Sequence, residues 1–162
     1  MKALKPSAVM ARSALSVYVV DAAEGLAELY TLFLKEKGYV VRAYDQRAEA
    51  LAALMADTTR PELLIMDCLG DSMPVDLFLQ RCLIAHPTLR ILIASESNQR
   101  DVMPFCSKPF RFIQKPFTAD EFLQEVEAAL DRPGVAGDPP RAHELFSVVQ
   151  VRVNQSALGR IF

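Results

Sequence analysis

The stretch Pro61-Glu62-Leu63-Leu64-Ile65-Met66-Asp67 is a short apolar run that ends in an aspartate, and it is the third of five apolar runs spaced along the chain. Most of these runs are followed by residues whose apolar members recur at helical spacing. Strand-like runs that alternate with helix-like runs are typical of a parallel sheet with helices on both faces. The sequence therefore predicts an α/β domain with a doubly wound parallel sheet.

The predicted elements follow from the same patterns. The five strands are expected at 15–20, 39–44, 63–66, 89–94 and 110–113. Helices are expected at 26–34, 47–55, 74–84 and 118–130, with a short or irregular one before residue 110, where Pro104 and Pro109 interrupt the chain. Gly38 favours an end to the first helix, because glycine commonly follows the last helical residue. Thr118 with Glu121 three residues later is a capping-box pattern, which marks the start of the last helix.

The composition is that of an ordinary globular domain. The 162 residues are 51% hydrophobic and 23% charged, and the net charge is −2. This balance excludes a mainly disordered chain and offers no electrostatic case for binding nucleic acid or an anionic membrane. Three cysteines without paired spacing argue against a disulfide scaffold. No apolar run reaches the roughly 18 residues that span a bilayer, and residues 1–16 lack the apolar core of a secretory signal, so we expect a cytoplasmic protein.

The chain divides into four segments. An N-terminal arm at 1–14 precedes the α/β domain at 15–131. A linker at 132–141 is rich in proline and glycine, which punctuate regular structure. The tail at 142–162 carries apolar residues whose spacing fits either a helix or a strand. We expect this tail to pack on its own domain or on a second subunit, because exposed apolar surface of this density usually marks a contact site.

Four of the predicted strands end in a polar residue: Asp21, Asp67, Ser95 and Lys115. In a doubly wound sheet, ligands bind outside the carboxyl ends of the strands, so we expect these side chains at one rim. Two carboxylates offer oxygen ligands to a hard cation such as Mg²⁺, and a lysine can pair with a phosphoryl oxygen. Carboxylate, metal, lysine and hydroxyl together are what phosphoryl transfer to an aspartate requires.

These motifs resemble those of a known family. The most specific match is the segment Phe112-Ile113-Gln114-Lys115-Pro116-Phe117. Four further segments match in the family's order along the chain: Val19-Val20-Asp21, Gly38-Tyr39, the run that ends in Asp67, and Ser95. With these residues the chain resembles the receiver domain of two-component response regulators. The resemblance covers about 70% of the chain, from about Leu15 to about Leu130. One lysine–proline pair alone would be weak evidence, but four ordered matches at predicted strand ends are specific.

The resemblance implies a fold and a set of roles. The fold is the flavodoxin-like receiver fold with strand order 2-1-3-4-5. Asp67 is implied to be the phosphoacceptor, and Lys115 to pair with the phosphoryl oxygens. Ser95 and Phe112 are implied to be the switch residues, whose side chains rearrange on phosphorylation.

The family's metal site is matched only in part. The resemblance implies a Mg²⁺ ion held by Asp21, Asp67 and the backbone carbonyl of Leu69. The family usually has two acids in a row after the first strand, and here Ala22 stands where the second acid is expected. Gly70 then stands where the family commonly has methionine.

Two residues could replace the missing acid. Glu24 and Asp71 are near enough in sequence to serve as a second carboxylate, and Asp71 stands where the family commonly has proline. If neither does, the alternative is a pseudo-receiver that acts as an interaction scaffold without phosphorylation.

The resemblance also implies a function. The chain is expected to be a stand-alone response regulator receiver and signalling phosphoprotein, which accepts a phosphoryl group from a histidine kinase or a histidine phosphotransfer protein in a phosphorelay. It is not expected to be an enzyme beyond its own phosphorylation and dephosphorylation. It would signal by protein–protein contact, with a homodimer through the face of the fourth helix, fifth strand and fifth helix or through the tail, and without nucleic acid or membrane.

Simpler interpretations compete at single residues. Asp21 could cap the helix that follows it, since aspartate favours that position. Ser97 competes with Ser95 for the role of the switch hydroxyl. An aspartate-nucleophile hydrolase is a further alternative, but such enzymes usually need an acid two residues after the nucleophile, where this chain has Leu69.

Overall fold

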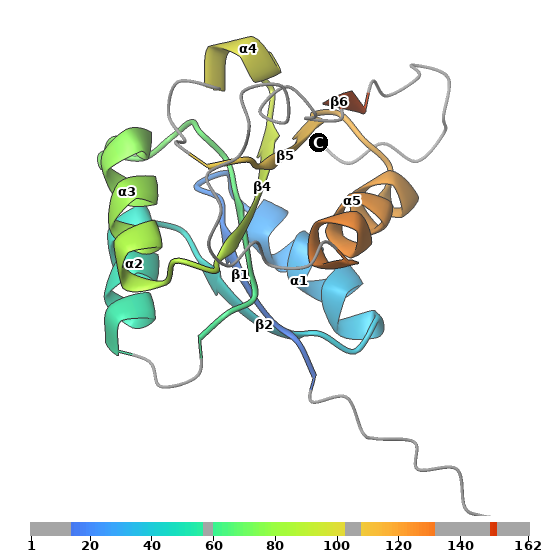
Figure 1. Cartoon of the computed structure of the whole chain (residues 1–162). Coiled ribbons are helices and arrows are strands. Elements are labelled where there is room, and N and C mark those ends of the chain that lie inside the picture. Colours follow the sequence, from blue (N-terminus) through green and yellow to red (C-terminus); the bar gives the residue numbers. More distant parts are fainter. Residues whose placement is uncertain (1–13, 57–59, 103–107, 132–149, 152–162) are drawn as a thin grey trace, which may run out of the picture.

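Figure 1 shows the computed structural model of the chain, which describes residues 14–56, 60–102, 108–131 and 150–151. The strands are β1 (Ser16–Val20), β2 (Val40–Tyr44), β3 (Leu63–Met66), β4 (Arg90–Ser95), β5 (Arg111–Gln114) and β6 (Gln150–Val151). They form one parallel sheet in the order β2-β1-β3-β4-β5-β6. The predicted order of the first five strands is confirmed.

Helices cover both faces of this sheet. α1 (Leu26–Glu36) and α5 (Ala119–Asp131) lie on one face, and α2 (Arg47–Ala56) and α3 (Val75–Ala85) lie on the other (Figure 1). α4 (Gln99–Val102) is a single turn after β4, as expected from the polar sequence there. Within the residues that the structure describes, no helix is long and apolar enough to cross a membrane.

Each helix layer encloses its own half of the core. On the α1–α5 side, the rings of Tyr30, Phe117 and Phe122 stack with centroids 4.8 to 5.9 Å apart. These three residues belong to α1, to the segment after β5 and to α5. Buried aromatic rings carry much of a core's apolar area, so this stack fixes both helices to the segment that follows β5.

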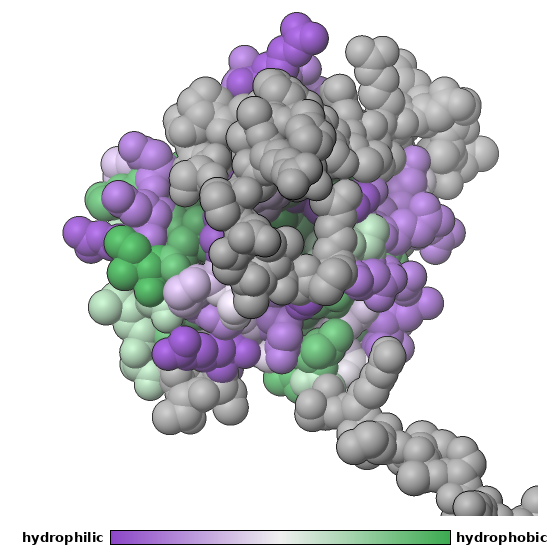
Figure 2. Space-filling model, in the orientation of Figure 1, coloured by the Kyte–Doolittle hydropathy of each residue, from purple (hydrophilic) through white to green (hydrophobic). Residues whose placement is uncertain are grey.

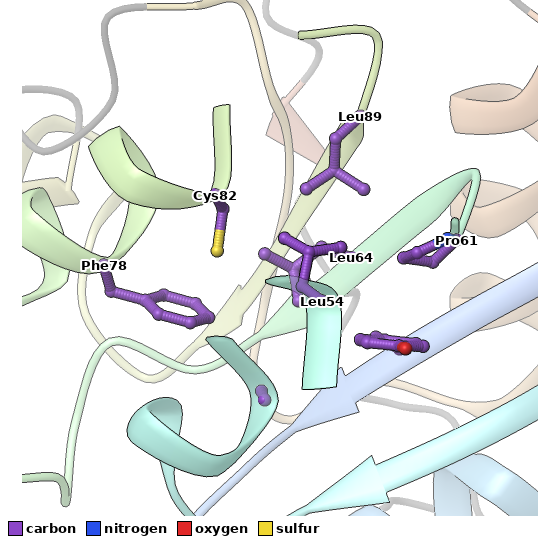
Figure 3. A pocket seen from close by; sticks show the side chains of 8 residues that line it. Leu54, Pro61, Leu64, Phe78, Cys82 and Leu89 are labelled. Carbon is purple, nitrogen blue, oxygen red and sulfur yellow. The ribbon is translucent and has the colours of Figure 1, made fainter. Parts of the chain in front are cut away.

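The α2–α3 side is packed by both aliphatic and aromatic residues. Figure 3 shows the small apolar hollow between β3 and these helices, where the side chains of Leu54, Leu64, Phe78 and Cys82 face one another. Burial raises the pKa of the Cys82 thiol to about 12. This cysteine therefore stays protonated and serves as a small buried hydrophobe.

The outer surface of the same helices is partly apolar. In Figure 2 the hydrophobic colour gathers over α2 and α3, while much of the remaining described surface in that view is hydrophilic. Met55 of α2 and Ile84 of α3 are 69% and 74% exposed. Scattered exposed apolar residues are normal on soluble domains, so this surface alone indicates no partner.

The helix boundaries agree with the local signals. Thr118 accepts a hydrogen bond from the amide of Glu121 at 3.2 Å, and the Glu121 carboxylate accepts one from the Thr118 amide at 2.8 Å. Gly38 follows α1 with a φ of 88°, a conformation that glycine adopts without strain. α1 begins after Gly25, so the interpretation of Asp21 as its cap is wrong.

The sixth strand is a difference from the predicted five. Gln150–Val151 of the tail pairs in parallel with Phe112 and Ile113 of β5, so at this point the tail is a strand on its own domain. The rest of the tail, the linker at 132–141 and all but Ala14 of the N-terminal arm lie outside the described residues.

Candidate functional site

The carboxyl ends of β1, β3 and β5 meet around one ammonium group. Nζ of Lys115 donates hydrogen bonds to Oδ2 of Asp21 at 2.9 Å and to Oδ2 of Asp67 at 2.8 Å. All three side chains are at most 9% exposed. Buried ions of this kind are stable when they are paired and hydrogen-bonded, and here two carboxylates share one lysine.

The sheet register places these groups. Val20 of β1 pairs with Met66 of β3, so Asp21 and Asp67 leave the sheet side by side. The amide of Lys115 donates to the carbonyl of Ser95 at 2.9 Å, which holds the lysine against the end of β4. Because parallel strands end at one edge, four residues far apart in sequence converge, as the sequence predicted.

The charges of the site reinforce one another. Burial opposes the charged form of Lys115, but the hydrogen bonds and negative charges of Asp67 and Asp21 outweigh it and raise the lysine pKa above its ordinary value. Lys115 is therefore a fixed cation at neutral pH. Two carboxylates and one ammonium leave the site with a net negative charge.

The remaining carboxylate oxygens are held by the backbone. Oδ1 of Asp21 accepts the amide of Ala23 at 2.9 Å, and Oδ1 of Asp67 accepts the amide of Leu69 at 3.2 Å. Every carboxylate oxygen at the site thus has a donor. These bonds fix the orientation of both acids before any ligand arrives.

The two residues expected to switch are both buried. Ser95 and Phe112 are each 0% exposed, on the neighbouring strands β4 and β5. Oγ of Ser95 accepts the amide of Ser97 at 3.3 Å, whereas Ser97 itself is less buried. Of the two serines, Ser95 is the one at the strand end beside Lys115.

Ala22 faces the loop that carries the phosphoacceptor candidate. A Cβ placed on Gly70 would lie 3.1 Å from the Cβ of Ala22, so these two residues oppose each other across the site's rim. Ala22 contributes a methyl group here, where a longer acid would bring an oxygen. The structure therefore places Ala22 at the rim, next to the acids that a cation would use.

Asp71 does not take the place of the missing acid. Its carboxylate accepts hydrogen bonds from the amide of Arg47 and, at 3.0 Å, from the amide of Met73. Partial burial opposes its ionisation, but the bonds from both amides and the charge of Arg47 keep the pKa of Asp71 below its usual range. Glu24 is exposed, and among the described residues no group of three acid, histidine or cysteine side chains gathers in a way that could hold a metal ion.

The donors that remain fit a hard cation in part. The carboxylates of Asp21 and Asp67 are adjacent, and the carbonyl of Leu69 lies on the same loop. Carboxylate and carbonyl oxygens are what Mg²⁺ prefers, and it usually keeps several waters and one or two carboxylates. Two acids and a carbonyl would supply part of such a coordination shell, and waters would supply the rest.

One residue of the site has no signal in the sequence. Arg47, the first residue of α2, is 2% exposed, and its guanidinium donates to carbonyls of the loop between β3 and α3. In the sequence, this arginine marks only the start of a predicted helix at 47–55. A lone arginine there is usually solvated, so nothing in the pattern marks it as buried.

Comparisons with known proteins agree with this geometry. No family model matches the chain. A receiver domain protein from Methanospirillum hungatei has a similar structure, with a TM-score of 0.65 at 18% identity over 74% of this chain and 95% of that one. The chemotaxis regulator CheY4 of Vibrio cholerae gives 0.63 at 20% identity, over 73% of this chain and 100% of that one. These likenesses establish the fold.

Two longer regulators contain a similar segment. NtrX from Brucella abortus, in a complex with ATP, has a TM-score of 0.63 at 25% identity over 74% of this chain and 27% of that one. The transcriptional regulator NtrC of Proteus hauseri is 23% identical over 143 residues, 87% of this chain, and the chain spans about 30% of that protein's length. With the predicted strand order, and with an acid pair, a lysine and a hydroxyl at the strand ends, the described part of residues 16–131 has the fold of a response regulator receiver domain.

Proposed function

We propose that this domain accepts a phosphoryl group on Asp67 and passes on its phosphorylation state by protein–protein contact. The observation that carries the proposal is the ammonium of Lys115 between the carboxylates of Asp67 and Asp21, 2.8 and 2.9 Å away. A carboxylate held in a fixed orientation beside a fixed cation is suited to attack phosphorus, because positioning and charge stabilisation supply most of the catalysis in phosphoryl transfer.

The step itself is an in-line displacement. The donor is a phosphohistidine of a histidine kinase or a histidine phosphotransfer protein. An oxygen of Asp67 forms the new bond to phosphorus as the bond from phosphorus to the histidine nitrogen breaks, and the imidazole leaves. Lys115 then pairs with a phosphoryl oxygen. Its contact with Asp21 holds it in reach of that oxygen.

A bound Mg²⁺ would offset further negative charge on the phosphoryl oxygens. The residues to hold it are Asp21, Asp67 and the carbonyl of Leu69. Ala22 supplies no oxygen, so this chain's own contribution to the coordination is smaller by one carboxylate. We therefore propose weak binding of the ion.

The read-out runs through the buried residues beside Lys115. The Ser95 hydroxyl donates to a phosphoryl oxygen and moves toward it, and Phe112 takes the space that the hydroxyl leaves. Ser95 ends β4 and Phe112 lies in β5, the two strands on either side of α4 in the sequence. A switch of this kind is a local change of charge and packing with a remote read-out, and the partner binds the changed surface.

A second candidate function is a scaffold that is never phosphorylated. It is favoured by the engagement of Asp71 with two backbone amides, which leaves the site without a substitute for the missing acid. In this function the domain presents the α4–β5–α5 surface in one state. Stand-alone action is proposed in either case, with the comparison to CheY4, matched over its whole length, in its support.

The test is phosphorylation of the full chain. Acetyl phosphate with Mg²⁺ is expected to add one phosphoryl group, seen by intact mass, and Asp67→Asn is expected to abolish it while the far-UV spectrum stays unchanged. Asp76→Asn, at an exposed aspartate of α3, is the matched control and should keep the label. Wild-type label retained on Asp67→Asn would reject the acceptor. No label and no spectral response to beryllofluoride would favour the scaffold.

A further inference from the structure

The side chain of Arg47, the first residue of α2, is a buried cation that contacts the loop between β3 and α3. Its Nη1 donates to the carbonyl of Met73 at 2.7 Å, and its Nη2 donates to the carbonyls of Asp67 at 3.0 Å and Leu69 at 3.4 Å. Its Nε is buried without a hydrogen-bond partner. One guanidinium thus holds three carbonyls of the segment that runs from the acceptor candidate to the start of α3.

The same loop binds Arg47 in return. The carboxylate of Asp71 accepts the backbone amide of Arg47, while the guanidinium of Arg47 contacts carbonyls on both sides of Asp71 in sequence. Two opposite charges therefore close the loop onto the first turn of α2. Charge-assisted hydrogen bonds of this type are stronger than neutral ones, so the loop is fixed from its start to its end.

This arrangement places a cation at a carbonyl that a metal ion would use. The carbonyl of Leu69 is directed at the guanidinium of Arg47, and Ala22 on the opposite side of the rim supplies no carboxylate. A divalent ion that takes this carbonyl has to compete with Arg47 for it. Like charges at close range also repel, which weakens the ion's binding further.

We propose that Arg47 is a positioning residue that holds the acceptor loop and, together with Ala22, sets the affinity of the site for a divalent cation. This inference rests on the proposed phosphoacceptor function, because the affinity for the cation matters for phosphorylation only if Asp67 accepts the phosphoryl group. In energetic terms, Arg47 and position 22 are coupled. A carboxylate introduced at position 22 increases the affinity for the divalent cation less while the guanidinium holds the Leu69 carbonyl. The increase is larger after the guanidinium is removed.

The test is a cycle of four full-length variants titrated with Mg²⁺ by calorimetry. These are the wild type, Ala22→Asp, Arg47→Gln and the double variant. Ala22→Asp and Arg47→Gln are each expected to tighten binding. The effect of Ala22→Asp should be about fivefold larger in the Arg47→Gln background, the size of a coupling between residues that share a partner. Arg81→Gln removes an exposed arginine of α3 and should leave the affinity unchanged. Additive effects, or an Arg47→Gln affinity equal to that of the wild type, would overturn the proposal.

A second measurement needs no substitution at a buried position. In the wild-type chain, the Nη resonances of Arg47 are expected to shift during a Mg²⁺ titration with the same midpoint as the Leu69 amide, since the ion displaces the guanidinium. Arg47 resonances that stay fixed at saturating Mg²⁺ would reject the proposal even if Arg47→Gln fails to fold. Coupled Mg²⁺ binding without any label from acetyl phosphate would reject the phosphoacceptor function and leave this inference standing.

Discussion

Arg111 of β5 and Glu125 of α5 form a two-point ion pair, with Nε to Oε2 at 2.7 Å and Nη2 to Oε1 at 3.2 Å. The side chains are 14% and 6% exposed. The pair ties the last helix to the strand that precedes Lys115. A bidentate guanidinium–carboxylate contact is directional, so it fixes the angle of α5 as well as its distance from the sheet.

Loss of one partner of this pair is expected to be costly. Glu125→Ala leaves the Arg111 guanidinium poorly compensated in a mostly buried position, and should lower the free energy of unfolding by about 3 kcal/mol. Replacing both residues, as Arg111→Leu with Glu125→Leu, should cost less, because no charge is then left without its partner. Urea denaturation measures both, and a double variant less stable than Glu125→Ala would contradict this account.

The hydroxyl of Tyr30 is expected to contribute nothing to stability. It is buried without a hydrogen-bond partner, and burial together with the negative charges of Asp21 and Asp67 raises its pKa above the ordinary value. Removing an unsatisfied hydroxyl relieves a desolvation penalty of about 1 kcal/mol. Tyr30→Phe should therefore match or exceed the wild-type melting temperature. A loss above about 1 kcal/mol would reveal a hydrogen bond.

Acid is expected to destabilise the domain through His86. Its Nε2 lies 2.8 Å from the carbonyl of Pro61. Burial lowers its pKa, and the charge of Arg60 adds to this, against the opposing effect of the Pro61 carbonyl. The imidazole is thus harder to protonate in the folded state than in the unfolded chain, so the stability it contributes is present above its unfolded pKa of about 6.5 and is lost as pH falls below that value.

The measurement is the free energy of unfolding at several pH values between about 7 and 5, the window where histidine titrates. His86→Gln should reduce the slope of stability against pH. His143→Gln, at the chain's other histidine, reports the contribution of a second imidazole. An unchanged slope in His86→Gln would show that the loss of stability in acid does not come from His86.

Truncation after Arg132 is expected to expose the outer edge of β5. Gln150–Val151 pairs there with Phe112 and Ile113, and removing it leaves backbone groups of β5 open to water. Hydrogen exchange at those β5 amides should accelerate, while amides between β1 and β2 keep their protection. The melting temperature should fall, or a dimer should become a monomer in sedimentation. Unchanged exchange, melting and sedimentation would reject a docked tail.

The sequence predicts the parts of this domain that depend on pattern. Strand positions, the strand-end residues and the cap at Thr118 follow from periodicity and residue chemistry, and the structure places them within one or two residues of the expected positions. The burial of Arg47 could not be predicted, because it depends on carbonyls more than 20 residues away that only the folded loop presents. The sixth strand could be predicted only as one of two alternatives, because the apolar spacing of the tail fits a helix as well as a strand.

The stack of Tyr30, Phe117 and Phe122 has a mechanical consequence. Phe117 lies two residues after Lys115, and its ring packs against a ring of α1 and a ring of α5, which also contact each other. A displacement of the Lys115 backbone would be resisted by the α1–α5 layer, because the segment after β5 is anchored to both helices, while the lysine side chain keeps its own rotamer freedom. A backbone shift that does occur at this point would act on α1 and α5 together, since Phe117 contacts a ring of each helix.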